Sequence, residues 1–226
     1  MLKLAAHSFE NWRLRAFENE RIIFGFSEIN FPAAALQRFF SPRPLLFLKQ
    51  VHSARIIHAR AWRPVSEADG LVLENPGPVA VIQTADCLPL FFFADDYDVG
   101  GVIHIGWRGL AQGIENKLLE MLPGPREKYF FYLGPSIEKK CYPVGEELVR
   151  QFTEKPYGAG IFTPQADGRY LMDIKAGLVA SLRLAGIEAK RIGDCGLCTF
   201  CSPELFPSYR RDGKTGKRVF NFLSLR

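Results

Sequence analysis

Short apolar runs separated by turn-forming residues recur along the chain and predict strands. The runs are rich in Val, Ile, Leu and Phe, and Gly, Pro, Asn or Asp stand between them, which is typical of strands. The predicted strands are 45–49, 79–83, 90–93, 99–105, 128–133 and 218–223. The third of these is predicted to begin only after Pro89, because proline has no amide hydrogen to give to a ladder.

Three segments carry the period of an amphipathic helix. Residues 110–122 place Leu and Ile side chains on one face and are followed by Pro123 and Gly124, which end helices. The other two are 174–184, with Asp173 as N-cap and Gly186 just past its end, and the shorter 146–152. Strands outnumber helices and do not alternate strictly with them. The pattern therefore favours an α+β fold of packed mixed sheets over a doubly wound parallel fold.

Length and composition favour one compact unit. With 226 residues, 47% hydrophobic and 23% charged, the chain has enough apolar side chains for a core, which excludes a disordered chain or a coiled coil. It shows no repeat, linker or low-complexity tract, so we predict a single domain over 1–226. The longest apolar run, 88–94, is far shorter than the roughly 20 residues of a membrane span. With no secretory signal at the N-terminus, we expect a cytoplasmic protein without a membrane partner.

The net charge says little about binding partners, whereas the cysteine count indicates the state of the thiols. Lys and Arg number 29 against 24 Asp and Glu, a net charge of +5 that suits small anions as well as nucleic acid. One basic cluster, read either as a solvated turn or as a binding element, contains Arg210, Arg211, Lys214, Lys217 and Arg218. Five cysteines without a secretory signal indicate free thiols or metal ligands rather than disulfides. We infer neither a nucleic acid nor an obligate protein partner.

Three side chains at predicted strand ends are candidates for a shared site. His52 follows an apolar strand, Cys87 lies in the polar turn before Pro89, and His104 ends a strand just before the sequence GWRG at 106–109. If they converge, they form a Cys/His2 set with an open fourth position, as in catalytic zinc sites. Their wide separation along the chain matches no zinc-finger template, and packed, hydrogen-bonded side chains are the alternative.

Neighbouring residues extend this candidate site. Asp86 directly precedes Cys87 and is expected to orient it or to act as an acid or base, unless it only caps the turn. Arg108 stands beside the predicted start of helix 110–122, where an anion could bind. Trp107 and the phenylalanines 91–93 are candidates for stacking on a flat aromatic ligand, although most of the 19 phenylalanines must be core.

The motifs in residues 49–223 resemble the YfiH family, also labelled polyphenol oxidase or laccase-domain proteins and described as purine nucleoside phosphorylases with adenosine deaminase activity. The matching motifs are QVHS at 50–53, ADGLV at 68–72, TADCLP at 84–89, HIGWRG at 104–109, GPSI at 134–137, CYPVG at 141–145, CT at 198–199 and SYRRDG at 208–213. The resemblance implies a four-layer α/β/β/α sandwich. It also implies a zinc site, with copper as the alternative, whose ligands are His52, Cys87 and His104.

The resemblance also implies small-molecule substrates, a nucleoside and phosphate. Within the matching motifs we expect Gln50, Asp69, Arg108 and Arg210 to bind them. The family usually carries an arginine and a Gly-Gly pair after a Phe-Ser in its N-terminal part, whereas here Phe26 and Ser27 are followed by EINFP. Arg108 or Arg210 is then expected to supply the cation for phosphate. Pro207 replaces the usual aromatic residue before SYRR.

The remaining candidates are weaker. Cys195, Cys198 and Cys201 form two overlapping CxxC spacings, which suggest a zinc or iron–sulfur site, but they supply only three thiols, and Cys141 belongs to a different motif. A packed loop with incidental thiols is the favoured interpretation. His58 is expected at the core or edge of a strand, and His7 at the surface.

Four functions remain open on sequence. The first is a metal-dependent purine nucleoside phosphorylase with adenosine deaminase activity. A copper-dependent polyphenol oxidase is the second, because His2Cys is also a blue-copper ligand set, although four histidines are too few for a multicopper laccase. The third is a cysteine hydrolase with Cys87 as nucleophile and His104 or His52 as its base. A metal-stabilised binding module is the fourth.

Overall fold

Two six-stranded sheets form the centre of the computed structural model, which describes residues 3–213 and 215–226. The first sheet has the order β1, β2, β3, β15, β7, β4 and includes the first and the last strand of the structure. Its neighbours are antiparallel except β4, which runs parallel to β7. The strands in sheet order are β1 (Ala5–Phe9), β2 (Trp12–Glu18), β3 (Ile22–Ser27), β15 (Val219–Leu225), β7 (Val79–Thr84) and β4 (Leu45–Phe47).

The second sheet has the order β14, β10, β8, β9, β6, β5 and is also mixed. Its outer strands β14 and β5 run parallel to their neighbours, whereas the inner pairs are antiparallel. The strands in sheet order are β14 (Ile192–Asp194), β10 (Tyr129–Leu133), β8 (Leu88–Ala94), β9 (Gly100–Ile105), β6 (Gly70–Leu73) and β5 (Ile56–His58). A small third sheet holds β11 (Pro143–Val144), β13 (Tyr170–Met172) and β12 (Phe162–Pro164).

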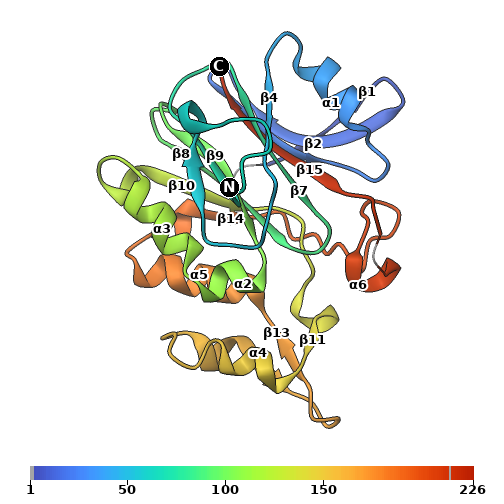
Figure 1. Ribbon diagram of the computed structural model, residues 1–226, viewed down its shortest axis with the longest axis vertical. Coiled ribbons are helices and arrows are strands. Elements are labelled where there is room, and N and C mark those ends of the chain that lie inside the picture. The colour runs from blue at the N-terminus through green and yellow to red at the C-terminus, as the bar shows by residue number, and fades with distance from the viewer. Residues whose placement is uncertain (1–2, 214) are drawn as a thin grey trace.

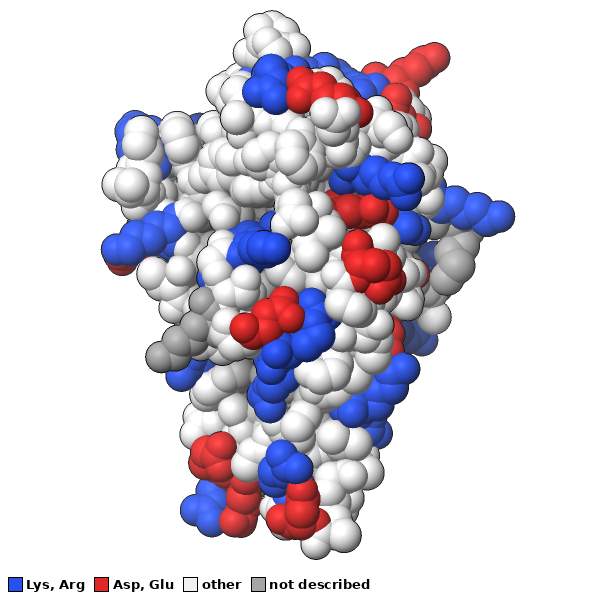
Figure 2. Space-filling model, turned by 90° about the vertical axis from the view of Figure 1, so that its right-hand side faces the viewer, with Lys and Arg blue, Asp and Glu red and all other residues white. Residues whose placement is uncertain are grey.

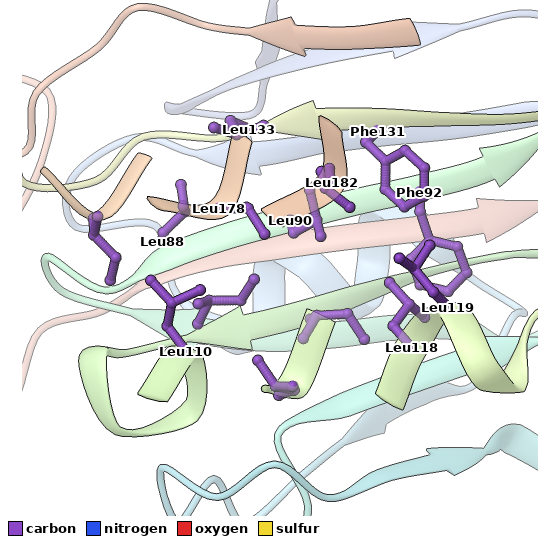
Figure 3. Close-up of a cluster of buried hydrophobic side chains, with 14 of the residues drawn as sticks. Leu88, Leu90, Phe92, Leu110, Leu118, Leu119, Phe131, Leu133, Leu178 and Leu182 are labelled. Carbon is purple, nitrogen blue, oxygen red and sulfur yellow. The ribbon is translucent and has the colours of Figure 1, made fainter. Parts of the chain in front are cut away.

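Helices cover the outer face of each large sheet. The helix α1 (Ala33–Phe40) packs its apolar side on the first sheet, and α2 (Trp107–Ala111), α3 (Ile114–Met121) and α5 (Ile174–Leu184) pack on the second (Figure 1). Figure 3 shows leucines of these three helices meeting Leu88, Leu90 and Phe92 of β8. The predicted α+β fold with an α/β/β/α arrangement of four layers is therefore confirmed.

Aromatic side chains fill the space between the two sheets. Phe24 on β3 lies 5.4 Å from the Phe91 ring and 5.5 Å from the rings of Phe93 and Tyr132, measured between centroids. Since Phe91 and Phe93 alternate with Phe92 on β8, the same strand contributes to the cores on both faces of the second sheet. The phenylalanines 91–93 are at most 1% exposed, so they are core residues rather than a purine platform.

Several predicted elements differ from the structure, and two of the differences have a reason in the backbone. The predicted helix 110–122 is two helices, α2 and α3, because Gly113 between them has a φ of 75°, which a continuous helix does not allow. The predicted strand 90–93 begins earlier, at Leu88. Pro89 is tolerated there because β10 has already ended at Leu133 beside it, so no partner strand needs its amide hydrogen, and its carbonyl accepts the Gly134 N–H at 2.9 Å.

Helix α5 forms as the sequence indicates. Its bounds are those predicted, the Asp173 side chain accepts the Ala176 N–H at 2.9 Å, and Gly186 beyond its end has a φ of 92°. The shorter helix α4 (Glu146–Arg150) ends before the predicted residue 152.

Among the described residues no helix has the length and hydropathy needed to cross a bilayer. On the face drawn in Figure 2, basic and acidic side chains are interspersed.

Glu115 is a buried carboxyl group whose ionisation opposes folding. It is 0% exposed on α3 and accepts the Ser181 hydroxyl at 2.8 Å, and burial raises its pKa above 4.5. A raised pKa in the folded state means that its contribution to stability is present below about pH 4.5 and is lost as pH rises through the folded-state value. We therefore expect Glu115→Gln to raise the melting temperature at pH 8 while changing it little at pH 4.

Thermal unfolding at both pH values measures this difference. Glu120→Gln is the matched control, because Glu120 is exposed on the same helix. Equal shifts for Glu115→Gln at the two pH values would contradict the assignment.

Candidate metal centre

His52, Cys87 and His104 meet at one end of the second sheet. His52 lies in the loop after β4, Cys87 in the turn between β7 and β8, and His104 near the end of β9. One ligand atom from each residue lies within 4.8 Å of the others, and the Cys87 Sγ is 3.9 Å from His52 Nε2. The two imidazole rings are 4.8 Å apart at 80°. Residues that the sequence separates widely thus form a cluster, which we call the His–Cys–His cluster.

The buried carboxylate of Asp69 accepts hydrogen bonds from both histidines. One of its oxygens accepts His104 Nδ1–H at 2.8 Å and the backbone N–H of His52 at 3.0 Å. The other accepts the backbone N–H and the hydroxyl of Ser53, each at 2.7 Å. Because the carboxylate can only accept, it holds a proton on His104 Nδ1, so in the neutral imidazole Nε2 is the nitrogen left for a metal. Asp69 also anchors the loop in which His52 adopts a φ of 57°.

The electrostatics of the cluster favour a thiolate. Burial raises the pKa of the Cys87 thiol, but His104 and His52 outweigh it and lower the pKa to about 6. Burial lowers the pKa of His104, but the Cys87 sulfur and Asp69 outweigh it and raise the pKa to about 9. The thiolate is the form that binds metals and attacks electrophiles, so both chemistries are open to Cys87.

Gly106 leaves room for the close approach of His52 and Cys87. A Cβ built on Gly106 would lie 3.0 Å from His52 Cδ2 and 3.3 Å from the Cys87 sulfur. Both distances are shorter than ordinary van der Waals contacts, so any larger residue would displace the two side chains.

The donor set suits a zinc or copper ion. Two imidazoles and one thiolate are typical ligands of both, and in a tetrahedral zinc site donors at roughly 2.0–2.3 Å from the ion lie about 3.3–3.8 Å from one another. The distance of 3.9 Å from Cys87 Sγ to His52 Nε2 is close to this range, and all three donor atoms lie within 4.8 Å of one another. The residues present therefore fit a metal with a further position left open.

The His–Cys–His cluster borders a cavity of about 590 Å³. The predicted residues Gln50, Asp86, Arg108 and Arg210 line it, together with the cluster. Asp69 does not line the cavity, because it is 0% exposed and lies behind the two histidines. The lining also includes cationic and aromatic side chains that sequence reasoning did not single out for the site: Arg218, Tyr142 and Tyr209.

Asp86 is occupied by the C-terminal loop rather than by the cluster. Its carboxylate accepts the hydroxyls of Thr199 at 2.6 Å and Ser208 at 3.0 Å, and the backbone N–H of Arg210 at 2.7 Å. Ser208 is the N-cap of α6 (Tyr209–Asp212), so Asp86 fixes the short helix that carries two of the cavity side chains. It lies next to Cys87 in sequence with a φ of 86°.

The other predicted cavity residues have defined partners. The side-chain amide of Gln50 pairs with the backbone of Gln83 at 2.7 and 2.8 Å, which continues the contact between β4 and β7 beyond the end of β4. The Arg108 guanidinium stacks on Trp107 at 4.6 Å. It has neither a hydrogen bond nor an ion pair within residues 3–213 and 215–226, so its donors are open to a ligand.

The basic cluster seen in the sequence divides in the structure. Arg210 and Arg218 reach the cavity, whereas Arg211 binds backbone carbonyls of the neighbouring loop and forms an ion pair with Asp212. Lys214 lies outside the described residues. The sequence marks Arg218 as part of a basic cluster. It does not show whether such an arginine faces a binding site or the solvent.

The remaining histidines and Cys195 lie elsewhere. His58 is on the edge strand β5, 3.3 Å from a carboxylate oxygen of Glu74, and His7 is on β1. Cys195 packs between hydrophobic clusters. Cys141, Cys198 and Cys201 come together as a second group of metal-ligand type, in contrast to the expected packed loop with incidental thiols.

The two packed sheets and the cluster beside the cavity define an enzyme of the laccase-domain class. The chain belongs to the family described as multi-copper polyphenol oxidoreductase laccase, whose model matches residues 29–225. This confirms the resemblance seen in the motifs.

Its relatives carry an enzyme name. It is 33% identical over 185 residues to the purine nucleoside phosphorylase of Haemophilus influenzae, covering 80% of this chain and 75% of that protein. It is 32% identical over 185 residues to the purine nucleoside phosphorylase YfiH of Escherichia coli, covering 81% of this chain and 75% of that protein.

Solved structures share the fold. The crystal structure of a Bacillus licheniformis protein named YfiH aligns with a TM-score of 0.85 and 25% identity, over 94% of this chain and 96% of that chain. The YlmD structure from Geobacillus stearothermophilus aligns equally well, at 0.85 with 22% identity and 98% of both chains.

Proposed function

We propose that the chain is a metal-dependent purine nucleoside phosphorylase with adenosine deaminase activity, and that both reactions take place in the cavity beside the His–Cys–His cluster. One observation carries the proposal: a donor set for a catalytic metal opens onto a cavity that also holds three arginines and three large aromatic side chains. The name purine nucleoside phosphorylase, which its relatives carry, supports the phosphorolysis.

In the phosphorolysis, the arginine and aromatic side chains of the cavity bind the phosphate and the purine. The C1′–N9 bond of the nucleoside breaks, a phosphate oxygen bonds to C1′, and the departing base takes up a proton. Arg108 and Arg218 hold the phosphate, since guanidinium groups match its oxygens and stabilise its charge. The Trp107 indole and the Tyr142 ring offer flat surfaces for the purine. In this chain these arginines replace the N-terminal arginine that stands in the family; here Glu28 at that segment binds Arg15 at 2.9 Å.

Deamination uses the His–Cys–His cluster rather than the arginines. Water replaces the 6-amino group of adenosine, which leaves as ammonia. His52, Cys87 and His104 would hold a zinc ion, which would supply a Lewis acid and lower the pKa of water to about 7. Asp69 fixes the tautomer of His104 and the position of His52, and we propose this positioning role for it instead of direct substrate contact.

A cysteine hydrolase is the second candidate, because one observation favours it. Cys87, His104 and Asp69 form a Cys–His–Asp series with a thiolate held beside an imidazole, as nucleophilic enzymes use. A nucleophile needs one base, however, whereas a second imidazole, that of His52, lies against the same sulfur. Two imidazoles around one thiolate suit a metal better.

Multicopper oxidation is poorly supported by the histidines. A mononuclear copper and a trinuclear cluster together need more imidazoles than the two that this site gathers, because His7 and His58 lie on other strands. A single copper in the His–Cys–His cluster is the remaining form of the oxidase alternative.

Initial rates with zinc-loaded protein test the proposal. Inosine with phosphate should give hypoxanthine and ribose 1-phosphate, and adenosine without phosphate should give inosine and ammonia. Arg108→Ala should raise the KM for phosphate about tenfold to a hundredfold, since a charge-assisted hydrogen bond contributes roughly 1.5–3 kcal/mol. Arg150→Ala is the matched control, because Arg150 is exposed on α4 and pairs with Glu146. Base release independent of phosphate, or metal-free protein that is active and is alkylated at Cys87, would contradict the proposal.

We also propose that the chain works as one domain in a reducing compartment such as the cytoplasm. All five cysteines are free, as expected where thiols stay reduced. Strands from both ends of the chain lie in the first sheet, which supports a single folding unit.

A further inference from the structure

A second group of sulfurs lies apart from the His–Cys–His cluster. Cys141 ends a 3-10 turn after β10, and Cys198 and Cys201 lie in the loop after β14. One ligand atom from each lies within 4.8 Å of the others, and the sulfurs of Cys141 and Cys201 are 3.2 Å apart. This group, which we call the thiol cluster, takes no part in the proposed reactions.

The loop of the thiol cluster has the form of a metal knuckle. Backbone N–H groups of Glu138, Cys201 and Phe200 hydrogen-bond to the Cys198 sulfur. Two of these donors lie two and three residues after Cys198 in its CxxC spacing. Such N–H donors stabilise a thiolate and orient it toward a cation, as the groups around metal ligands generally do.

The loop is held rigid before any ion binds. Arg211 donates to the carbonyls of Thr199, Phe200 and Phe206, each at 2.8 Å. The Thr199 N–H also donates to Ser136 at 3.1 Å, beside the bridge between Ser136 and Cys198. A preformed loop costs less conformational entropy on binding than a mobile one.

Three thiols in this arrangement suit an ion better than a disulfide. A disulfide joins two sulfurs at about 2.05 Å and would leave the third thiol unused. Thiolates select soft or borderline cations such as Zn²⁺. Because Cys201 is exposed, a fourth position at the ion is open to solvent.

We propose that Cys141, Cys198 and Cys201 bind a second, thiophilic divalent cation, with Zn²⁺ as the probe. The ion fastens the segment after β10 to the loop after β14. Both segments are tied to the cavity lining: Tyr142, which follows Cys141, is part of it, and Thr199, which follows Cys198, donates to the lining residue Asp86 at 2.6 Å. The site is therefore structural and supports one wall of the cavity.

Zinc stoichiometry of the full chain tests this proposal. We expect wild-type protein to bind one equivalent more than Cys141→Ser or Cys201→Ser, while Cys195→Ser binds as much as wild type. Cys201 is the more informative position, because its exposed side chain can be replaced without disturbing the core. Substitution of Co²⁺ should give sulfur-to-metal charge-transfer absorption that weakens in the Cys201→Ser variant.

The two metal sites are separable in the same experiment. His52→Ala should lose the other equivalent and keep the thiol cluster, so failure of the proposed function does not affect this result. Equal zinc content in wild type, Cys141→Ser and Cys201→Ser would overturn the proposal. So would a Cys141–Cys201 disulfide, detected by mass spectrometry, in protein that was incubated with zinc.

Discussion

Replacing Cys87 with alanine should reduce nucleoside turnover to background and remove the metal of the His–Cys–His cluster. The thiolate is the one anionic ligand of the set, and its pKa of about 6 keeps it ionised at neutral pH. His52→Ala and His104→Ala should have the same effect, because two remaining donors hold a catalytic ion poorly. Steady-state rates and metal content of each purified variant measure the loss.

Cys195→Ala is the matched control for this series. Cys195 is also a free thiol, but it packs between hydrophobic clusters away from the site, so activity and metal content should remain. Cys201→Ala should keep the metal of the His–Cys–His cluster and measurable turnover, because the thiol cluster supports a wall of the cavity but supplies no ligand to the catalytic ion. Activity that survives in two of the three ligand variants would contradict the proposed site.

Replacing Asp69 with asparagine should weaken metal binding about tenfold to a hundredfold, the usual effect of removing a carboxylate behind a metal-binding histidine. The asparagine amide cannot accept all the N–H and O–H groups that now converge on the carboxylate from His52, Ser53 and His104. Turnover should recover in part when the zinc concentration is raised, which a general loss of folding would not allow. Zinc affinity by chelator competition measures the change.

Asp86→Asn gives the contrasting result in this account. Asp86 holds α6 and the loop of Thr199 rather than the histidines, so the variant should keep its zinc affinity and show a raised KM for phosphate and nucleoside. Weakened zinc binding in Asp86→Asn, with Asp69→Asn unaffected, would reverse the roles that we propose for the two carboxylates.

The sequence predicts the inner part of the fold better than its edges. Buried on both faces, β8 and β9 read as continuous apolar runs, and α5 carries its own capping signals at Asp173 and Gly186. By contrast, β1 is mostly exposed and β2 alternates arginines with apolar residues, so neither stands out as an apolar run. Gly113 divides a periodic segment because its positive φ matters more than the pattern of leucines around it.

The site shows the same division. Local sequence marked His52, Cys87 and His104 as strand-end residues, and the structure brings them together. Asp69 is fully buried and binds the histidines, whereas Asp86 lines the cavity and binds the C-terminal loop. Sequence spacing does not distinguish these two positions. Cys141 meets the CxxC pair of the thiol cluster only through tertiary folding, because the small sheet and α5 lie between them in the chain.

X-ray absorption at the zinc edge tests the central claim most directly. The sample is protein that carries Cys141→Ser and Cys201→Ser, loaded with a single equivalent of zinc so that the His–Cys–His cluster is observed alone. The account predicts one sulfur neighbour at about 2.3 Å and two imidazole nitrogens at about 2.0 Å, with a lighter atom completing the shell. A zinc environment with no sulfur, or with more than one sulfur, would contradict it.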